Sequence, residues 1–137
     1  MDRNKLIFWI STGLLSILML FSAGMYFTNY DTISEAVTGL GYPAFIIYPL
    51  GTAKILGLIA IWSRLSHTLK EWAYAGFFFD TALATQAHLM AQDGAHIPAM
   101  VGLVLVLVSY WAGNKMENQV PKSDSKILDE FMLKDGK

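Results

Sequence analysis

The sequence contains no cysteine, and this absence removes several kinds of chemistry at once. A chain without thiols forms no disulfide, carries no thiol redox relay and offers no thiolate to a zinc ion or an iron–sulfur cluster. Charge is also scarce, since Asp, Glu, Lys and Arg make up 15% of the 137 residues, whereas hydrophobic residues make up 54%. This composition is unusual for a soluble domain and indicates a small membrane protein.

Four apolar runs account for most of the chain. Each is close to or above the roughly 17 residues that a transmembrane helix needs. None shows the two-residue alternation of a barrel strand, and lipid cannot satisfy an unpaired backbone, so helices are expected. The sequence therefore predicts an all-α fold, an integral membrane four-helix bundle within residues 1–114. Its spans are expected at about residues 6–27, 43–62, 71–91 and 97–113.

The two ends of the chain need separate interpretations. The basic start and the small residues Ser22, Ala23 and Gly24 resemble a signal peptide with its cleavage site. The apolar run is longer than the roughly 7–15 residues of a signal's hydrophobic region, so we expect a retained span. The tail, residues 115–137, is either disordered or a short amphipathic helix. The apolar side of that helix would consist of Ile127, Leu128, Phe131 and Met132.

Basic residues are distributed unevenly between the two ends of the predicted bundle. Lys and Arg precede the first run, occupy the connection 63–70 and follow the fourth run, whereas the first and third connections contain none. Lys and Arg concentrate on the cytoplasmic side of membrane proteins. We therefore expect a multi-pass protein whose N- and C-termini are cytoplasmic. All four tryptophans fall at the cytoplasmic ends of the spans, which agrees with this orientation.

Two charged residues, Lys54 and Asp80, each lie near the middle of an apolar run. The two runs are joined by the short polar connection 63–70, so they pack as antiparallel neighbours. His67 lies midway between the two charges, which places each of them about 13 residues, or roughly 20 Å, from the turn. We therefore expect Lys54 and Asp80 to meet at one level inside the bilayer.

Such a pair needs a compensating reason, because each charge costs about 2.5–3.5 kcal/mol at the centre of a spanning helix. One interpretation is a structural clamp that specifies which helices pair. A second is a polar pocket that binds a lipophilic molecule or couples to a proton, and a third is pairing with a partner subunit's charge. For the pocket, the predicted ligand-binding residues are Lys54, Asp80, His88, Tyr26 and Ser22.

Small residues recur at helical spacing around Asp80, and we expect them to pack helix on helix. This stripe consists of Ala73, Gly76, Ala84 and Ala87. Further along, His88 and His96 stand on either side of a short connection that contains Asp93, so the two histidines are expected to approach each other. Their spacing matches no recognised ligand motif, so no metal site is predicted.

Several short motifs resemble those of the DoxX-like family. They occur in order, cover about residues 6–113, and include LGYP at 40–43, AKILG at 53–57 and GFFFD at 76–80. The resemblance implies a four-helix protein of the bacterial inner membrane. The family is named after a membrane subunit of an archaeal thiosulfate:quinone oxidoreductase.

Two functional hypotheses follow. The first is a non-enzymatic bundle, with no catalytic residue, that holds a small lipophilic ligand or a partner helix against Lys54 and Asp80, as a single chain or a homo-oligomer. The alternative is a membrane subunit of a quinone-linked oxidoreductase complex, in which Lys54 or His88 hydrogen-bonds a quinone carbonyl and Asp80 handles a proton. A transporter is disfavoured because the chain has no internal repeat. No nucleic-acid partner is expected.

Overall fold

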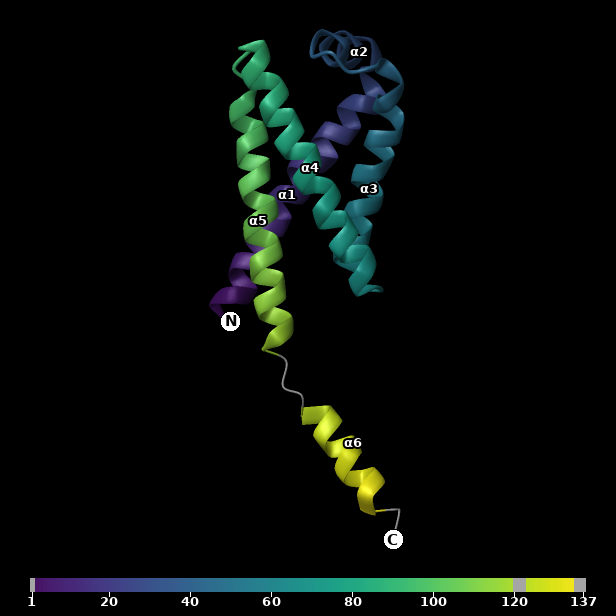
Figure 1. Ribbon diagram of the computed structural model, residues 1–137, viewed down its shortest axis with the longest axis vertical. Coiled ribbons are helices and arrows are strands. Elements are labelled where there is room, and N and C mark those ends of the chain that lie inside the picture. The colour runs from purple at the N-terminus through teal and green to yellow at the C-terminus, as the bar shows by residue number, and fades with distance from the viewer. Residues whose placement is uncertain (1, 120–122, 135–137) are drawn as a thin grey trace.

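The computed structural model describes residues 2–119 and 123–134, and in this part of the chain every regular element is helical (Figure 1). The predicted all-α class is therefore confirmed. The elements in chain order are α1 (Arg3–Thr28), α2 (Tyr30–Gly39), η1 (Ala44–Ile46), α3 (Ile47–Ser63), α4 (His67–Ala91), α5 (His96–Asn118) and α6 (Ser123–Lys134).

Four long helices form the bundle. α1 packs against α3 and α5, and α4 packs against the same two helices, so the four form a closed ring. The start of α1, the turn between α3 and α4 and the end of α5 lie at one end of the bundle (Figure 1). The short helix α2 lies across the other end, and α4 leans away from α3 towards α5 as it approaches that end.

Three segments of the described chain are long and apolar enough to cross a membrane: Arg3–Thr28, Ala44–Ser63 and His96–Asn118. They coincide with the first, second and fourth predicted spans. α4 is not among them, because polar residues such as Asp80, Gln86 and His88 interrupt its apolar run. The third predicted span, at residues 71–91, therefore stays a prediction.

The connection between α3 and α4 is shorter than predicted. Arg64 ends α3 in the left-handed conformation, with φ of 51°. The Ser66 hydroxyl then accepts a hydrogen bond from the Leu69 N–H at 3.4 Å and caps the next helix. As a result His67 is the first residue of α4 and not the middle of a loop.

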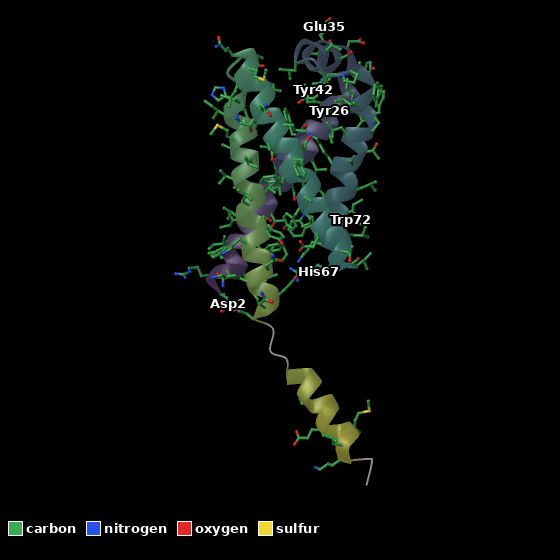
Figure 2. All side chains as sticks on the ribbon, viewed as in Figure 1. Asp2, Tyr26, Glu35, Tyr42, His67 and Trp72 are labelled. Atoms are coloured by element: carbon green, nitrogen blue, oxygen red, sulfur yellow. The ribbon has the colours of Figure 1, made fainter. Side chains whose placement is uncertain are left out.

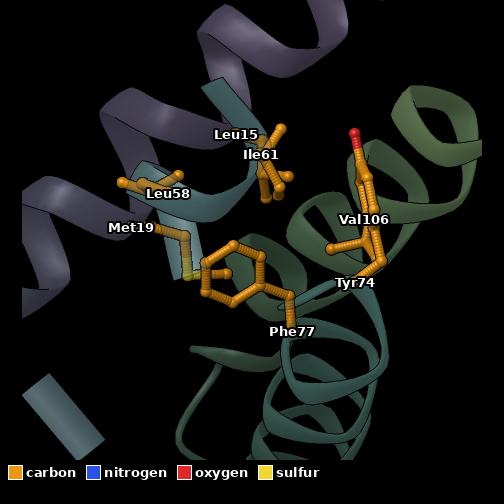
Figure 3. Close-up of a cluster of buried hydrophobic side chains, with 7 residues drawn as sticks. All are labelled: Leu15, Met19, Leu58, Ile61, Tyr74, Phe77 and Val106. Carbon is orange, nitrogen blue, oxygen red and sulfur yellow. The ribbon is translucent and has the colours of Figure 1, made fainter. Parts of the chain in front are cut away.

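The apolar core lies between α1, α3, α4 and α5 (Figure 3). Phe77 of α4 reaches α3 at Gly57, where an added Cβ would lie 2.7 Å from the Phe77 Cζ atom. The absence of a side chain at Gly57 thus allows α3 and α4 to approach closely. The buried cluster comprises Leu15, Met19, Leu58, Ile61, Tyr74, Phe77 and Val106.

A small polar network crosses this core. The Ser109 hydroxyl of α5 lies 2.6 Å from the Thr12 hydroxyl of α1 and 2.8 Å from the Tyr74 hydroxyl of α4. All three side chains are buried. Because unpaired hydroxyls are costly in such surroundings, these bonds favour one register between the three helices.

Pairs of aromatic rings lie at both ends of the bundle. The Trp9 and Trp62 rings lie 5.3 Å apart, whereas the Tyr30 and Tyr48 rings stack 5.0 Å apart near α2. Figure 2 shows the same division, with Tyr26 and Tyr42 beneath α2 and with His67 and Trp72 at the opposite end.

Helix α6 lies in the tail, where the sequence leaves a helix or disorder open. Of the predicted apolar side, Ile127, Phe131 and Met132 are exposed. The side chain of Leu128 lies outside the described residues.

Candidate functional site

Lys54 lies on the buried face of α3, in the middle of the bundle. The same face carries Gly51, Leu58 and Ile61, which follow the spacing of three to four residues that places side chains on one side of a helix. Gly51 leaves room for α1, because a Cβ there would lie 3.1 Å from the Phe27 ring. The lysine side chain is consequently only 7% exposed.

The ammonium of Lys54 has three protein neighbours. Its Nζ lies 3.1 Å from Asp80 Oδ2, donates a hydrogen bond to Ser22 Oγ at 2.9 Å, and stands 4.9 Å from the centre of the Tyr26 ring. The attraction of a cation to an aromatic face adds to the ion pair. The structure therefore brings together four of the five predicted ligand-binding residues, from α1, α3 and α4.

A cavity of about 590 Å³ adjoins this cluster on the side nearer α2. Asp80, whose side chain is 15% exposed, stands in its wall. The remaining polar residues of the wall include Tyr26, Tyr42 and His88. Most of the lining is apolar and comes from α2, the segment after it, α3 and α4. It includes Val37, Leu40, Phe45, Leu50, Phe79 and Leu83.

The small-residue stripe of α4 forms part of this wall, and at Gly76 the prediction that it packs helix on helix is wrong. Gly76, Ala84 and Ala87 line the cavity, and a Cβ added at Gly76 would meet no other atom within 4 Å. The reason is the divergence of α4 from α3 towards the α2 end (Figure 1). The small residues of this stripe therefore border open space beside α4.

His88 lines the same cavity, and its partner is an aspartate. The His88 Nδ1 atom lies 2.7 Å from Asp93 Oδ2, and Asp93 Oδ1 accepts the Ala95 N–H at 2.9 Å. Two hydrogen bonds hold the pKa of the Asp93 carboxyl below its ordinary value: the bond with His88 has the larger effect, and the bond from the Ala95 N–H has the smaller one. Within the described residues no three His, Cys, Asp or Glu side chains are grouped as metal ligands.

The sequence model of the DoxX-like family matches residues 10–110. The chain belongs to the DoxX-like family. No curated protein and no solved structure matches it. Together with the three apolar helices, this membership identifies a multi-pass helical membrane protein whose surroundings are lipid. The matched range contains all five predicted binding residues of the DoxX-like chain.

Two features of the DoxX-like chain escape sequence reasoning. The part of the cavity lining that comes from α2 and the segment after it carries no charge, although the LGYP motif at 40–43 lies within it. The second feature is Lys70, the last residue of the predicted connection 63–70, which is buried in the first turns of α4 and paired with Glu117 at the end of α5. The Ser66 cap, four residues earlier, is the sequence signal that extends α4 to include Lys70.

Proposed function

We propose that this DoxX-like protein is a non-enzymatic membrane protein that binds a small lipophilic molecule in the cavity between α3 and α4. One observation carries the proposal: a mainly apolar cavity of about 590 Å³ has an ion-paired carboxylate, Asp80, in its wall. Small-molecule sites typically enclose roughly 300–1,000 Å³ and combine apolar walls with a few polar groups that orient the ligand. Both properties are present.

The proposal includes a placement in the membrane. α4 would cross the bilayer as a fourth helix, because it is flanked by α3 and α5 and because the Lys54 ammonium compensates its central charge. The end of the bundle that contains both the chain start and the α3–α4 turn would face the cytoplasm, as the distribution of basic residues indicates. In the bacterial inner membrane the cavity would then lie in the outer half of the bilayer.

The sequence also suggests two alternatives: a partner helix as the occupant of the cavity, and a role as a subunit of a redox complex. A partner helix would also meet the apolar wall, but it would need to fit beneath α2. A subunit of a quinone-linked oxidoreductase would use Lys54 or His88 to hydrogen-bond a carbonyl. The neighbours of Lys54 favour the binding protein over this role, because Ser22, Asp80 and Tyr26 already surround the ammonium.

The test is identification of a copurifying molecule. The protein would be purified in several mild detergents, extracted with organic solvent and analysed by mass spectrometry. Gly76→Leu places a side chain in the cavity, where the structure has open space, and should remove the molecule. Gly24→Leu is the matched control, because Gly24 also has open space but does not line the cavity.

We expect the same molecule from the wild type and from Gly24→Leu, and its loss from Gly76→Leu. Absence of any bound molecule from the wild type in every detergent would contradict the proposal. Equal recovery from the two variants would show that the molecule binds elsewhere. Melting curves of both variants establish that each is folded.

A further inference from the structure

We infer that the polar group of the ligand is a neutral hydroxyl, which donates its hydrogen bond to Asp80. The inference rests on the proposed function and specifies the chemistry of the molecule at that site. It follows from three observations: the contacts of Lys54, the position of the Asp80 carboxylate, and the balance of charge between them.

Lys54 has no free face for a ligand. An ammonium has three N–H donors, and Lys54 has three neighbours that can engage them: the Ser22 hydroxyl at 2.9 Å, the Asp80 carboxylate at 3.1 Å and the face of the Tyr26 ring. The side chain is buried and is not part of the cavity wall. Lys54 therefore compensates the charge of Asp80 and does not present a donor to the cavity.

Asp80 presents an acceptor instead. Lys54 contacts Oδ2 of the carboxylate, and no protein donor within residues 2–119 and 123–134 bonds to Oδ1. A carboxylate has about four lone-pair positions and can accept several hydrogen bonds. Because the side chain is part of the cavity wall, a ligand donor can reach it. Among the described wall residues none is Lys or Arg, and His88 Nδ1 already contacts Asp93 Oδ2 at 2.7 Å, so the wall offers no unpaired cation to an acceptor or an anion.

The charge balance selects a hydroxyl over an ammonium. Lys54 and Asp80 together are neutral, and a cationic ligand would add one uncompensated charge to an apolar cavity. Burial of an unpaired charge is costly, whereas a hydroxyl requires only one good acceptor. The hydroxyls of Tyr26 and Tyr42 both donate and accept, so they do not alter this selection.

The test compares four probes on one hydrocarbon skeleton. Cyclohexylphenol donates a hydrogen bond, and its methyl ether cyclohexylanisole does not. Cyclohexylacetophenone only accepts, and cyclohexylbenzylamine is a cation. Dissociation constants would be measured by calorimetry on the full chain in lipid nanodiscs, with partitioning into empty nanodiscs subtracted.

We expect the phenol to bind at least about tenfold more tightly than each of the other three, because a hydrogen bond to a charged acceptor contributes roughly that factor. Equal binding of the phenol and its methyl ether would overturn the inference and leave the proposed function standing. Tightest binding of the ketone or of the amine would also overturn it. If no probe saturates the protein, the proposed function fails together with the inference.

A paired variant tests the same point without a change of probe. Lys54→Met together with Asp80→Leu removes both charges, so the phenol and the anisole should bind equally while the apolar walls still hold both. A preference for the phenol that survives in this folded variant would show that Asp80 is not its acceptor. Should the variant fail to fold, the four-probe comparison on the wild type decides the question.

Discussion

The Lys54–Asp80 pair gives a prediction about stability that separates a balanced pair from two independent charges. Three variants are needed: Lys54→Met, Asp80→Leu, and the two changes together. Met and Leu replace the charged side chains with apolar ones that fit an apolar site. The single variants each leave one buried charge without its partner, whereas the double variant leaves neither.

The expected magnitudes follow from burial. Removal of one partner of a buried ion pair costs about 3–5 kcal/mol of unfolding free energy, and replacement of both by apolar residues is often neutral or stabilising. Asp80→Leu should lower the unfolding free energy more than Lys54→Met does, because it leaves the Lys54 ammonium unpaired and that side chain is only 7% exposed. Lys54→Met should cost about 3 kcal/mol, at the lower end, because the Asp80 carboxylate at 15% exposure retains contact with the cavity.

The assay is equilibrium unfolding in mixed micelles, analysed as a double-mutant cycle. The pair of His67 and Glu71, 3.7 Å apart and with the His67 side chain 70% exposed, provides the control, and His67→Gln should change stability by less than about 1 kcal/mol. Tolerance of both single changes combined with unfolding of the double variant would refute the reasoning. So would additive costs, because independent charges would then explain the data.

Two further predictions concern the wall of the cavity and its outer end. Gly57→Ala should destabilise the protein, because its Cβ would meet the buried Phe77 ring at 2.7 Å. Gly76→Ala should stabilise the protein by about 0.5–1 kcal/mol, because Gly76 lies within a helix and has open space around it. Melting experiments that gave the opposite signs would contradict this contrast. His88→Ala should raise the pKa of the Asp93 carboxyl part of the way towards its ordinary value, which carboxyl NMR titration would show. Because the pKa of Asp93 is lowered in the folded state, the stability that the His88–Asp93 contact contributes is present above the ordinary carboxyl pKa and is lost as pH falls through the lowered value. An Asp93 titration that His88→Ala leaves unchanged would contradict the role given to His88.

The helices and the Lys54–Asp80 pair can be predicted from the sequence for definite physical reasons. Apolar runs of spanning length leave helices as the only reasonable element. The midpoint argument places Lys54 and Asp80 at one level because helical rise is constant, and their atoms lie 3.1 Å apart in the structure. The side chains of Ser22 and Tyr26 complete the same cluster because they recur at helical spacing on α1.

The cavity cannot be predicted from the sequence in this way. A stripe of small residues permits close helix packing, but it does not require it. Whether Gly76 and Ala84 meet a helix or a space depends on the angle between α3 and α4, and that angle follows from contacts elsewhere, such as Phe77 against Gly57. The roof formed by Val37 and Leu40 depends on how α2 lies across the bundle. Such long-range geometry has no local sequence pattern.

Lys70, the second buried lysine, offers a comparison for the Lys54–Asp80 pair. Lys70 pairs with Glu117 and joins α4 to α5, but the glutamate is 41% exposed at the end of its helix, so the pair reaches the surface. Lys54 and Asp80 join α3 to α4 in the interior instead, and one carboxylate oxygen remains available beside a cavity. Helix pairing alone would be served equally well by a pair at the helix ends, where desolvation costs less. Under the proposed function, the clamp between α3 and α4 would also hold Asp80 ready for a ligand, and the structural and binding interpretations would then describe two roles of one pair.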